Sequence, residues 1–96
     1  MVVGLLQVEL MIGDAVSLKD KRRVVRSVKD RLHREHLVAV AEVDRLDAHQ
    51  VAVLGIAAVS NSVSHVQGAL DRIVEQLRGN GRFVLNDHAV EILTGR

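Results

Sequence analysis

Four stretches of the chain show the alternation of apolar and polar residues, or the short apolar run, that is typical of β-strands. They cover residues 2–12, 37–43, 50–59 and 82–93. The second and third stretches are separated by the six residues 44–49, a length that suits a β-hairpin loop. The sequence therefore predicts four strands, two of which form a hairpin.

Two further segments have the 3.6-residue period of amphipathic helices. Ser17 is a good N-cap for the first, and Asp20, three residues later, favours the positive end of a helix that should run to about Glu35. The second helix follows the N-cap candidates at 60–62 and ends at the Gly-Asn-Gly turn of residues 79–81. The predicted buried stripes are Leu18, Val24, Val25, Val28 and Leu32 in the first helix, and Val63, Val66, Leu70, Ile73, Val74 and Leu77 in the second.

The predicted elements follow one another as βαββαβ in a single domain of residues 1–96. This order indicates the ferredoxin-like α+β architecture, a four-stranded antiparallel sheet with both helices on one face. The last strand loses its regularity at 86–88, where we expect a β-bulge, and residues 94–96 are predicted to form a tail. A chain of this length can bury a modest core but no deep, secluded pocket.

The sheet face that the helices leave open is also apolar. Residues 51–59 are apolar or glycine on both faces, and Val3, Leu5 and Met11 lie opposite the buried positions of the first strand. Exposed apolar surface of this extent is unusual in a monomer. We therefore predict a homo-oligomer, most simply a homodimer, that uses the open face or a strand edge. The alternative is that small alanine side chains are exposed there at little cost.

Charge is concentrated in the first helix. Residues 19–34 carry eight Lys or Arg and two Asp, a net charge of +6, although the whole chain nets only +1. A basic cluster of this density is typical of surfaces that bind phosphates. We expect contact with RNA or a ribosome-associated partner. One alternative is an ordinary solvated helix face, and another is a homodimeric protein-interaction or small-ligand regulatory domain with no nucleic-acid role. The candidate contact residues are Lys19, Lys21, Arg22, Arg23, Arg26 and Arg34.

Composition excludes several classes of chemistry. The chain has no Cys, which excludes disulfides and thiolate metal sites, and a single Phe with no Trp or Tyr, which excludes aromatic platforms for stacking bases. Contact with RNA would therefore be made to phosphates. We recognise no catalytic or metal-binding motif, and we expect no catalytic residue, metal or cofactor. The sequence has neither a membrane-spanning stretch nor a signal peptide, so we expect a cytoplasmic protein with no membrane partner.

The predicted hairpin carries a second candidate, an interface or polar site made of Glu42, Asp47 and His49. Glu42 interrupts an apolar strand, as Glu9 does in the first strand, and two glutamates on the open face could pair with basic residues across an interface. Carboxylates with a histidine could also bind a divalent cation or transfer protons. The alternative is that Asp47 and His49 occupy an ordinary turn, and Glu42 a solvated strand position.

Four blocks of the sequence are shared with a known family: Ser17-Leu18-Lys19-Asp20-Lys21-Arg22-Arg23, Val3-Gly4-Leu5, Ala41-Glu42-Val43, and Asp47 with Gln50. Through these blocks the chain resembles the YlxP-like family, small bacterial domains of unknown function, over nearly its whole length. The resemblance implies a ferredoxin-like fold, self-association and a link to translation and ribosome maturation; it carries over no catalytic residue. Family members often have a tryptophan shortly after the hairpin aspartate, where this chain has His49.

Overall fold

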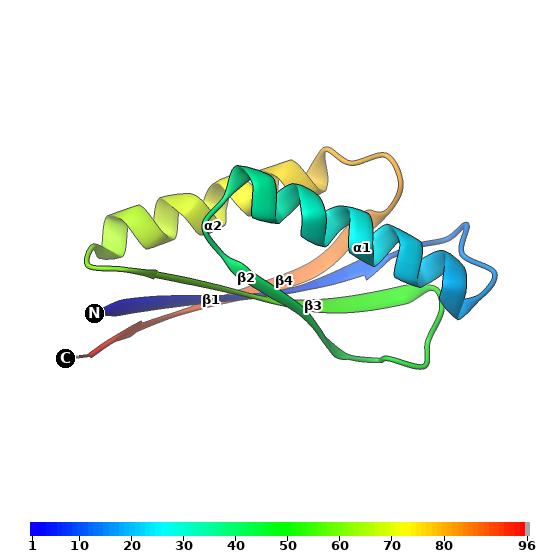
Figure 1. Cartoon of the computed structure of the whole chain (residues 1–96), viewed down its shortest axis with the longest axis horizontal. Helices are drawn as coiled ribbons and strands as arrows, with labels where there is room; N and C mark the ends of the chain where they lie inside the picture. Colours follow the sequence, from blue (N-terminus) through cyan, green and yellow to red (C-terminus); the bar gives the residue numbers. More distant parts are fainter. Residues whose placement is uncertain (96) are drawn as a thin grey trace.

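The computed structural model describes residues 1–95 and confirms the predicted order of elements. The four strands form one antiparallel sheet in the order β2-β3-β1-β4, and both helices lie on the same side of it (Figure 1). This is the ferredoxin-like α+β fold. Its elements are β1 (Val2–Met11), α1 (Leu18–Glu35), β2 (Ala39–Asp44), β3 (Val51–Ser60), α2 (Val63–Arg78) and β4 (Val84–Thr94).

Both helices begin at the predicted cap residues. Ser17 Oγ accepts a hydrogen bond from the Asp20 amide at 3.1 Å, and Ser62 Oγ accepts one from the His65 amide at 3.3 Å. The Asp20 carboxylate in turn accepts from the amide of Val16 at 3.0 Å, one residue before the cap. These bonds satisfy amide groups that a helix start leaves without intrahelical partners, and so fix where each helix begins.

The hydrophobic core lies between the two helices and the sheet face that they cover. The predicted helix stripes are confirmed in their main members, but Leu18 is only half-buried and Val63 is 48% exposed. Each fully buried aliphatic side chain contributes roughly 1.5–3 kcal/mol of transfer free energy. The most deeply buried side chains include Leu6, Leu10, Leu54, Leu70 and Ile73.

Both edge strands contain a β-bulge. In β2 the pairing passes from Glu42 to Asp44, so that Val43 has no partner in β3. In β4 the pairing passes from Asp87 to Leu85, which leaves out Asn86 and confirms the predicted irregularity. The side chain of Val43 lies over Gly55, where a Cβ atom would come within 2.9 Å of Val43 Cγ1.

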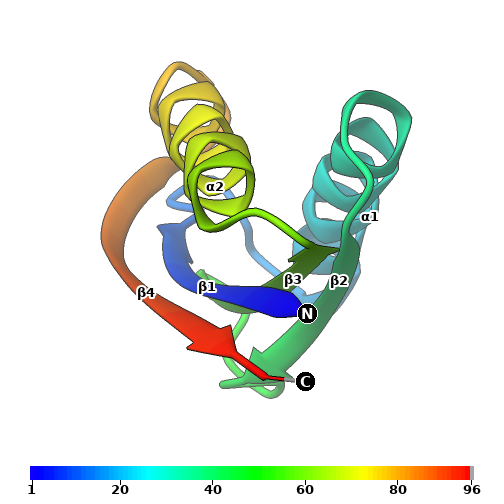
Figure 2. The ribbon, with the colours of Figure 1, turned by 90° about the vertical axis from the view of Figure 1, so that its left-hand side faces the viewer.

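The two ends of the described chain pair with each other. The Met1 amino group donates to the Gly95 carbonyl at 2.7 Å, and the Gly95 amide donates to the Met1 carbonyl at 2.9 Å. The prediction of a tail at residues 94–96 is therefore wrong for Thr94, which lies in β4, and for Gly95, which pairs with Met1. Arg96 is outside the described residues. Met1 and Gly95 therefore lie at the same end of the molecule (Figures 1 and 2). No helix in residues 1–95 is long and apolar enough to cross a membrane.

Candidate functional site

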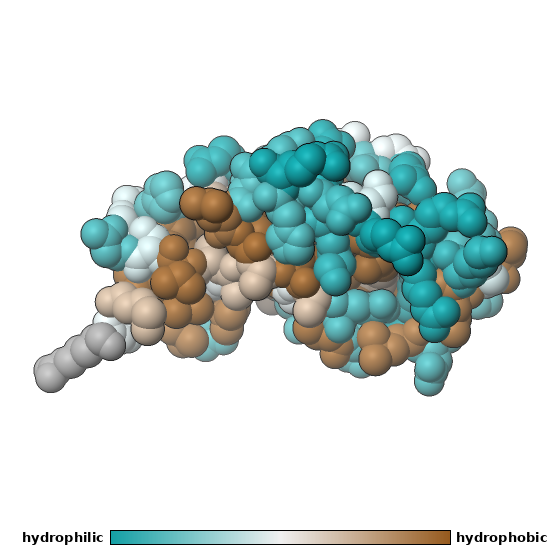
Figure 3. Space-filling model, in the orientation of Figure 1, coloured by the Kyte–Doolittle hydropathy of each residue, from teal (hydrophilic) through white to brown (hydrophobic). Residues whose placement is uncertain are grey.

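Five predicted contact residues lie exposed on α1, on the side turned away from the sheet. We call this surface the basic face. It is fixed by helical spacing, because the buried valine stripe holds the opposite side of the helix against the sheet. Within residues 1–95 none of the five forms an ion pair, whereas neighbouring Arg31 pairs with Glu35 at 3.3 Å. Hydrophilic residues cover α1 in Figure 3. The basic face consists of Lys19, Arg22, Arg23, Arg26 and Arg34.

The sixth predicted contact, Lys21, is inside the protein, so its assignment to an anion-binding surface is wrong. Its side chain is 1% exposed and its Nζ lies 2.7 Å from Glu42 Oε2. The same ammonium donates to the backbone carbonyls of Arg45 at 3.0 Å, Leu46 at 3.2 Å and Val51 at 3.2 Å. These groups tie α1 to both ends of the β2–β3 loop.

A signal for the burial of Lys21 was present in the sequence. Lys21 precedes Val24, Val25 and Val28 by three, four and seven residues, the spacings that place side chains on one face of a helix. It therefore belongs to the buried stripe. The prediction placed it on the surface because lysine side chains are usually exposed.

Glu42 and Glu9 lie on opposite faces of the sheet, contrary to expectation. Glu42 faces α1 and forms the ion pair with Lys21. Its Oε2 is shielded from solvent and accepts no well-aligned hydrogen bond within the described chain, so the ion pair is what neutralises it. Glu9 lies on the open face, where Asn86 Nδ2 donates to Glu9 Oε2 at 2.6 Å. The partner predicted for Glu42 across an interface is thus supplied by its own chain.

Asp47 and His49 are exposed in the β2–β3 loop. The loop turns at Arg45, whose φ of 54° is left-handed, and the Ala48 amide donates to the Arg45 carbonyl at 3.1 Å. Glu42 points to the helices instead, and no group of three or more His, Asp or Glu in residues 1–95 is arranged to hold a metal ion. The structure does not bring Glu42, Asp47 and His49 together into one site.

A hollow of about 160 Å³, which we call the interhelical cleft, separates α1 from α2. The two helices diverge above the sheet in Figure 2. Arg82, from the segment between α2 and β4, reaches across to α1, and its Nη1 donates to Ser27 Oγ at 3.4 Å. Sequence reasoning missed this residue because 55 positions separate it from Ser27. The floor is Val24, Val28, Leu32, Leu77 and Phe83, and the rim is Ser27, Arg31, Gln76, Asn80 and Arg82.

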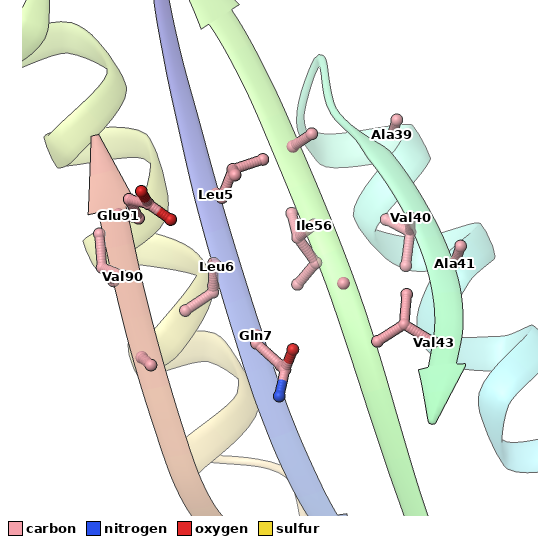
Figure 4. Close-up of a pocket in the computed structure, with 13 residues that line it drawn as sticks. Leu5, Leu6, Gln7, Ala39, Val40, Ala41, Val43, Ile56, Val90 and Glu91 are labelled. Carbon is pink, nitrogen blue, oxygen red and sulfur yellow. The ribbon is translucent and has the colours of Figure 1, made fainter. Parts of the chain in front are cut away.

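The open face of the sheet is concave. A groove of about 790 Å³ runs across its four strands, and the stick view shows aliphatic side chains along most of it (Figure 4). Leu5 is 37% exposed and Val43 is 51% exposed. In Figure 3, hydrophobic residues lie on both sides of the hollowed lower edge of the molecule. We call this surface the open-face groove; its small lining residues are Ala39, Ala41, Gly55, Ala57 and Ala89.

The sequence matches the family model described as "Protein of unknown function (DUF503)" over residues 3–90. A relative from Bacillus subtilis (strain 168), "Uncharacterized protein YlxP", is 35% identical over 72 residues, which are 75% of this chain and 78% of that protein. Among solved structures, "De novo designed protein Foldit4" is similar over 100% of both chains, with a TM-score of 0.57 and 16% sequence identity. At that identity the likeness shows a shared fold and nothing further.

Proposed function

Because the chain belongs to the DUF503 family, the YlxP-like proteins of unknown function, we propose its function from its own surface: it binds the phosphate backbone of structured RNA through the basic face of α1. The cytoplasmic setting expected from the sequence is part of this proposal. The proposal needs no catalytic residue and no cofactor.

The observation that carries the proposal is the basic face itself, five exposed cations that form no ion pair within residues 1–95. With Lys21 set aside, residues 19–34 still carry seven Lys or Arg against two Asp. Like charges this close repel one another, and a polyanion relieves the repulsion while it releases its own condensed counterions. Since the chain has one Phe and no Trp or Tyr, binding would depend on phosphates and would fall steeply with salt.

Fluorescence anisotropy with a labelled RNA hairpin tests the proposal at about 50 and 200 mM salt. We expect the affinity to fall between the two conditions. The double variant Arg22→Glu/Arg26→Glu should weaken binding and lower the slope of log affinity against log salt by about one per lost phosphate contact.

The matched control is Arg72→Glu/Arg78→Glu, which makes the same charge change at exposed positions of α2. It should retain most of the affinity. Absence of binding at low salt, or equal losses in the two double variants, would show that the basic face is only solvated surface.

The open-face groove favours a second candidate function, self-association with another copy of this chain. A two-fold dimer would place the same concave surface against itself and cover the exposed aliphatic residues of both copies. The small side chains of Ala41, Ala57 and Ala89 keep much of the groove lining low, so that two sheets could approach to the roughly 10 Å spacing of packed sheets.

Sedimentation at low micromolar concentration, with Leu5→Lys and Leu37→Lys, tests this second candidate. Leu5 lines the groove, whereas Leu37 is 99% exposed outside the strands. We expect a dimer for the parent chain and for Leu37→Lys, and a folded monomer for Leu5→Lys. A monomeric parent chain would refute self-association, and a small apolar molecule would then be the occupant to seek.

A further inference from the structure

We propose that the interhelical cleft is a subsite for a single unpaired nucleotide, with the base on its apolar floor and the phosphate on its arginine rim. The inference rests on the proposed RNA binding and adds to it a preference for RNA with a base outside the helical stack. The shared chemistry is a nucleoside monophosphate unit, either within RNA or free in solution.

The size and lining of the cleft suit one base, with its phosphate at the rim. An apolar cavity of about 150 Å³ holds a benzene ring, and the cleft measures about 160 Å³. Drug-sized ligands need roughly 300 Å³ or more, so the cleft is too small for a large cofactor. Its lining combines an aliphatic floor, closed by the Phe83 side chain, with a rim that has two guanidinium groups and no carboxylate.

Arg82 is placed to bind a phosphate. Its hydrogen bond to Ser27 Oγ is long, at 3.4 Å, and no ion pair holds its guanidinium within residues 1–95. Arg31 uses its Nε toward Glu35, which leaves its other guanidinium donors for a ligand. A planar guanidinium can donate two parallel hydrogen bonds to two oxygens of a phosphate, whereas the single oxygen of a hydroxyl group cannot accept such a pair.

Two amide side chains on the rim are fixed through their oxygens. Asn80 Oδ1 accepts from the Arg82 amide at 2.8 Å, and Gln76 Oε1 lies 2.9 Å from His36 Nε2. Their NH₂ groups make no hydrogen bond within residues 1–95 and can donate to the edge of a base. Unstacked bases in RNA loops and bulges expose their edges for this kind of contact.

The cleft is continuous with the basic face. Residues four positions apart in a helix lie next to each other on one side, and Arg23, Ser27 and Arg31 form such a row on α1. The row runs from the basic face to the rim of the cleft. Arg23 and Arg82 also line a common hollow at the start of α1. An RNA helix lying on the basic face would therefore have its unpaired nucleotide within reach of the cleft.

The experiment compares a fully paired RNA hairpin with the same hairpin carrying one bulged nucleotide. We expect the parent chain to favour the bulged RNA by about tenfold, toward the lower end of the range for one base stacked on an aromatic side chain. Ser27→Leu fills the mouth of the cleft without changing charge, and Arg82→Ala removes the rim cation. Both should lower affinity for the bulged RNA toward that for the paired RNA. Arg78→Ala makes the same change as Arg82→Ala, and His33→Leu places a leucine at another exposed position of α1. Both positions lie outside the cleft, and both variants should retain the preference.

The outcomes separate this inference from the proposed function. Equal affinity of the parent chain for both RNAs overturns the assignment of the cleft to a nucleotide within RNA and leaves phosphate binding intact. NMR titration with uridine monophosphate, and separately with inorganic phosphate, supplies a second readout. Shifts of the Asn80 and Gln76 side-chain amides with the nucleotide alone support the subsite even where a variant folds poorly. If these shifts occur but no RNA binds, the ligand is a free nucleotide and the RNA proposal fails; if neither ligand shifts them and no bulge preference exists, the cleft is no subsite.

Discussion

Lys21 lies inside the protein with four oxygen atoms within 3.2 Å of its ammonium nitrogen. Two of these oxygens are backbone carbonyls of the β2–β3 loop, one is the carbonyl of Val51 at the start of β3, and the fourth belongs to the carboxylate of Glu42. An ammonium group has three protons, so all its donors are used and the loop carbonyls gain a charged partner. The most sheltered cation of the basic helix therefore acts on stability, while its exposed neighbours are available for binding.

We expect Lys21→Met to lower the free energy of unfolding by about 3–5 kcal/mol, because it leaves the Glu42 carboxylate shielded without a counterion. Urea denaturation followed by circular dichroism measures the change. The double variant Lys21→Met/Glu42→Leu should recover part of the loss, since it removes the stranded carboxylate but not the loop carbonyls that lose their donor.

Lys19→Met is the control, two positions away on the exposed side of the same helix. It should change stability by no more than about 0.5 kcal/mol. A loss at Lys21 as small as the loss at Lys19 would contradict the role given to the buried ammonium.

At the scale of elements, α2 crosses β1 so closely that position 4 has room for glycine only. A Cβ atom on Gly4 would lie 2.9 Å from Leu70 Cδ1 and would also collide with Val66. The φ of Gly4 is not positive, so the backbone conformation does not require glycine and the constraint comes from packing. The contact sets how closely α2 packs on the sheet. The same helix carries Leu77, which forms part of the floor of the interhelical cleft.

We expect Gly4→Ala to destabilise the protein by about 1–3 kcal/mol through overpacking. Gly13→Ala is the matched control, because a Cβ there meets no atom within 4 Å and its φ is not positive. That change should be neutral or stabilise by up to about 1 kcal/mol, since alanine restricts the unfolded chain. The melting temperatures of the two variants, measured side by side, test this difference. Equal melting temperatures would show that α2 can shift to make room for a Cβ atom at position 4.

At the scale of the whole molecule, the paired residues Met1 and Gly95 lie at one end of a body 44 Å long, and the β2–β3 loop lies at the other (Figure 1). A short Gly/Ser linker could therefore join the ends without distorting β1 or β4. The place where the chain is reopened then determines the stability of the product.

We expect a circular permutant opened between Asn80 and Gly81 to fold. A permutant opened between Asp47 and Ala48 should have a free energy of unfolding that is lower by about 1.5 kcal/mol or more. The cut separates the Arg45 and Leu46 carbonyls from Val51 along the chain, and so weakens the hydrogen bonds that all three accept from the Lys21 ammonium. Chemical denaturation of both permutants measures the difference. Greater stability of the second permutant would mean that the loop needs no anchoring by Lys21.

Periodicity was sufficient to predict the fold from the sequence. Alternating and helical patterns located all six elements, Ser17 marked a helix start, and the irregular segment around Asn86 marked a bulge. These features depend on residues close together in the chain. The helical spacing of Lys21 from the buried valines also predicts its burial, although a lysine is usually exposed.

The remaining features of the site depend on long-range packing. Arg82 meets Ser27 only because α2 returns alongside α1, and no local pattern contains that contact. The faces of Glu9 and Glu42 depend on strands β1 and β2, which are not neighbours because β3 lies between them. Whether the basic face and the open-face groove bind partners is a property of surfaces, and the sequence alone leaves it a prediction.

The two bulges have a consequence for how copies of this chain can meet. They lie in β2 and β4, the strands whose outer edges would otherwise offer a regular row of amide and carbonyl groups to another chain. An interrupted edge is a poor template for adding strands, which protects a β-sheet protein from open-ended polymerisation. The face-to-face dimer proposed above would close after two copies, so under that proposal the irregular edges favour a finite assembly over a fibre.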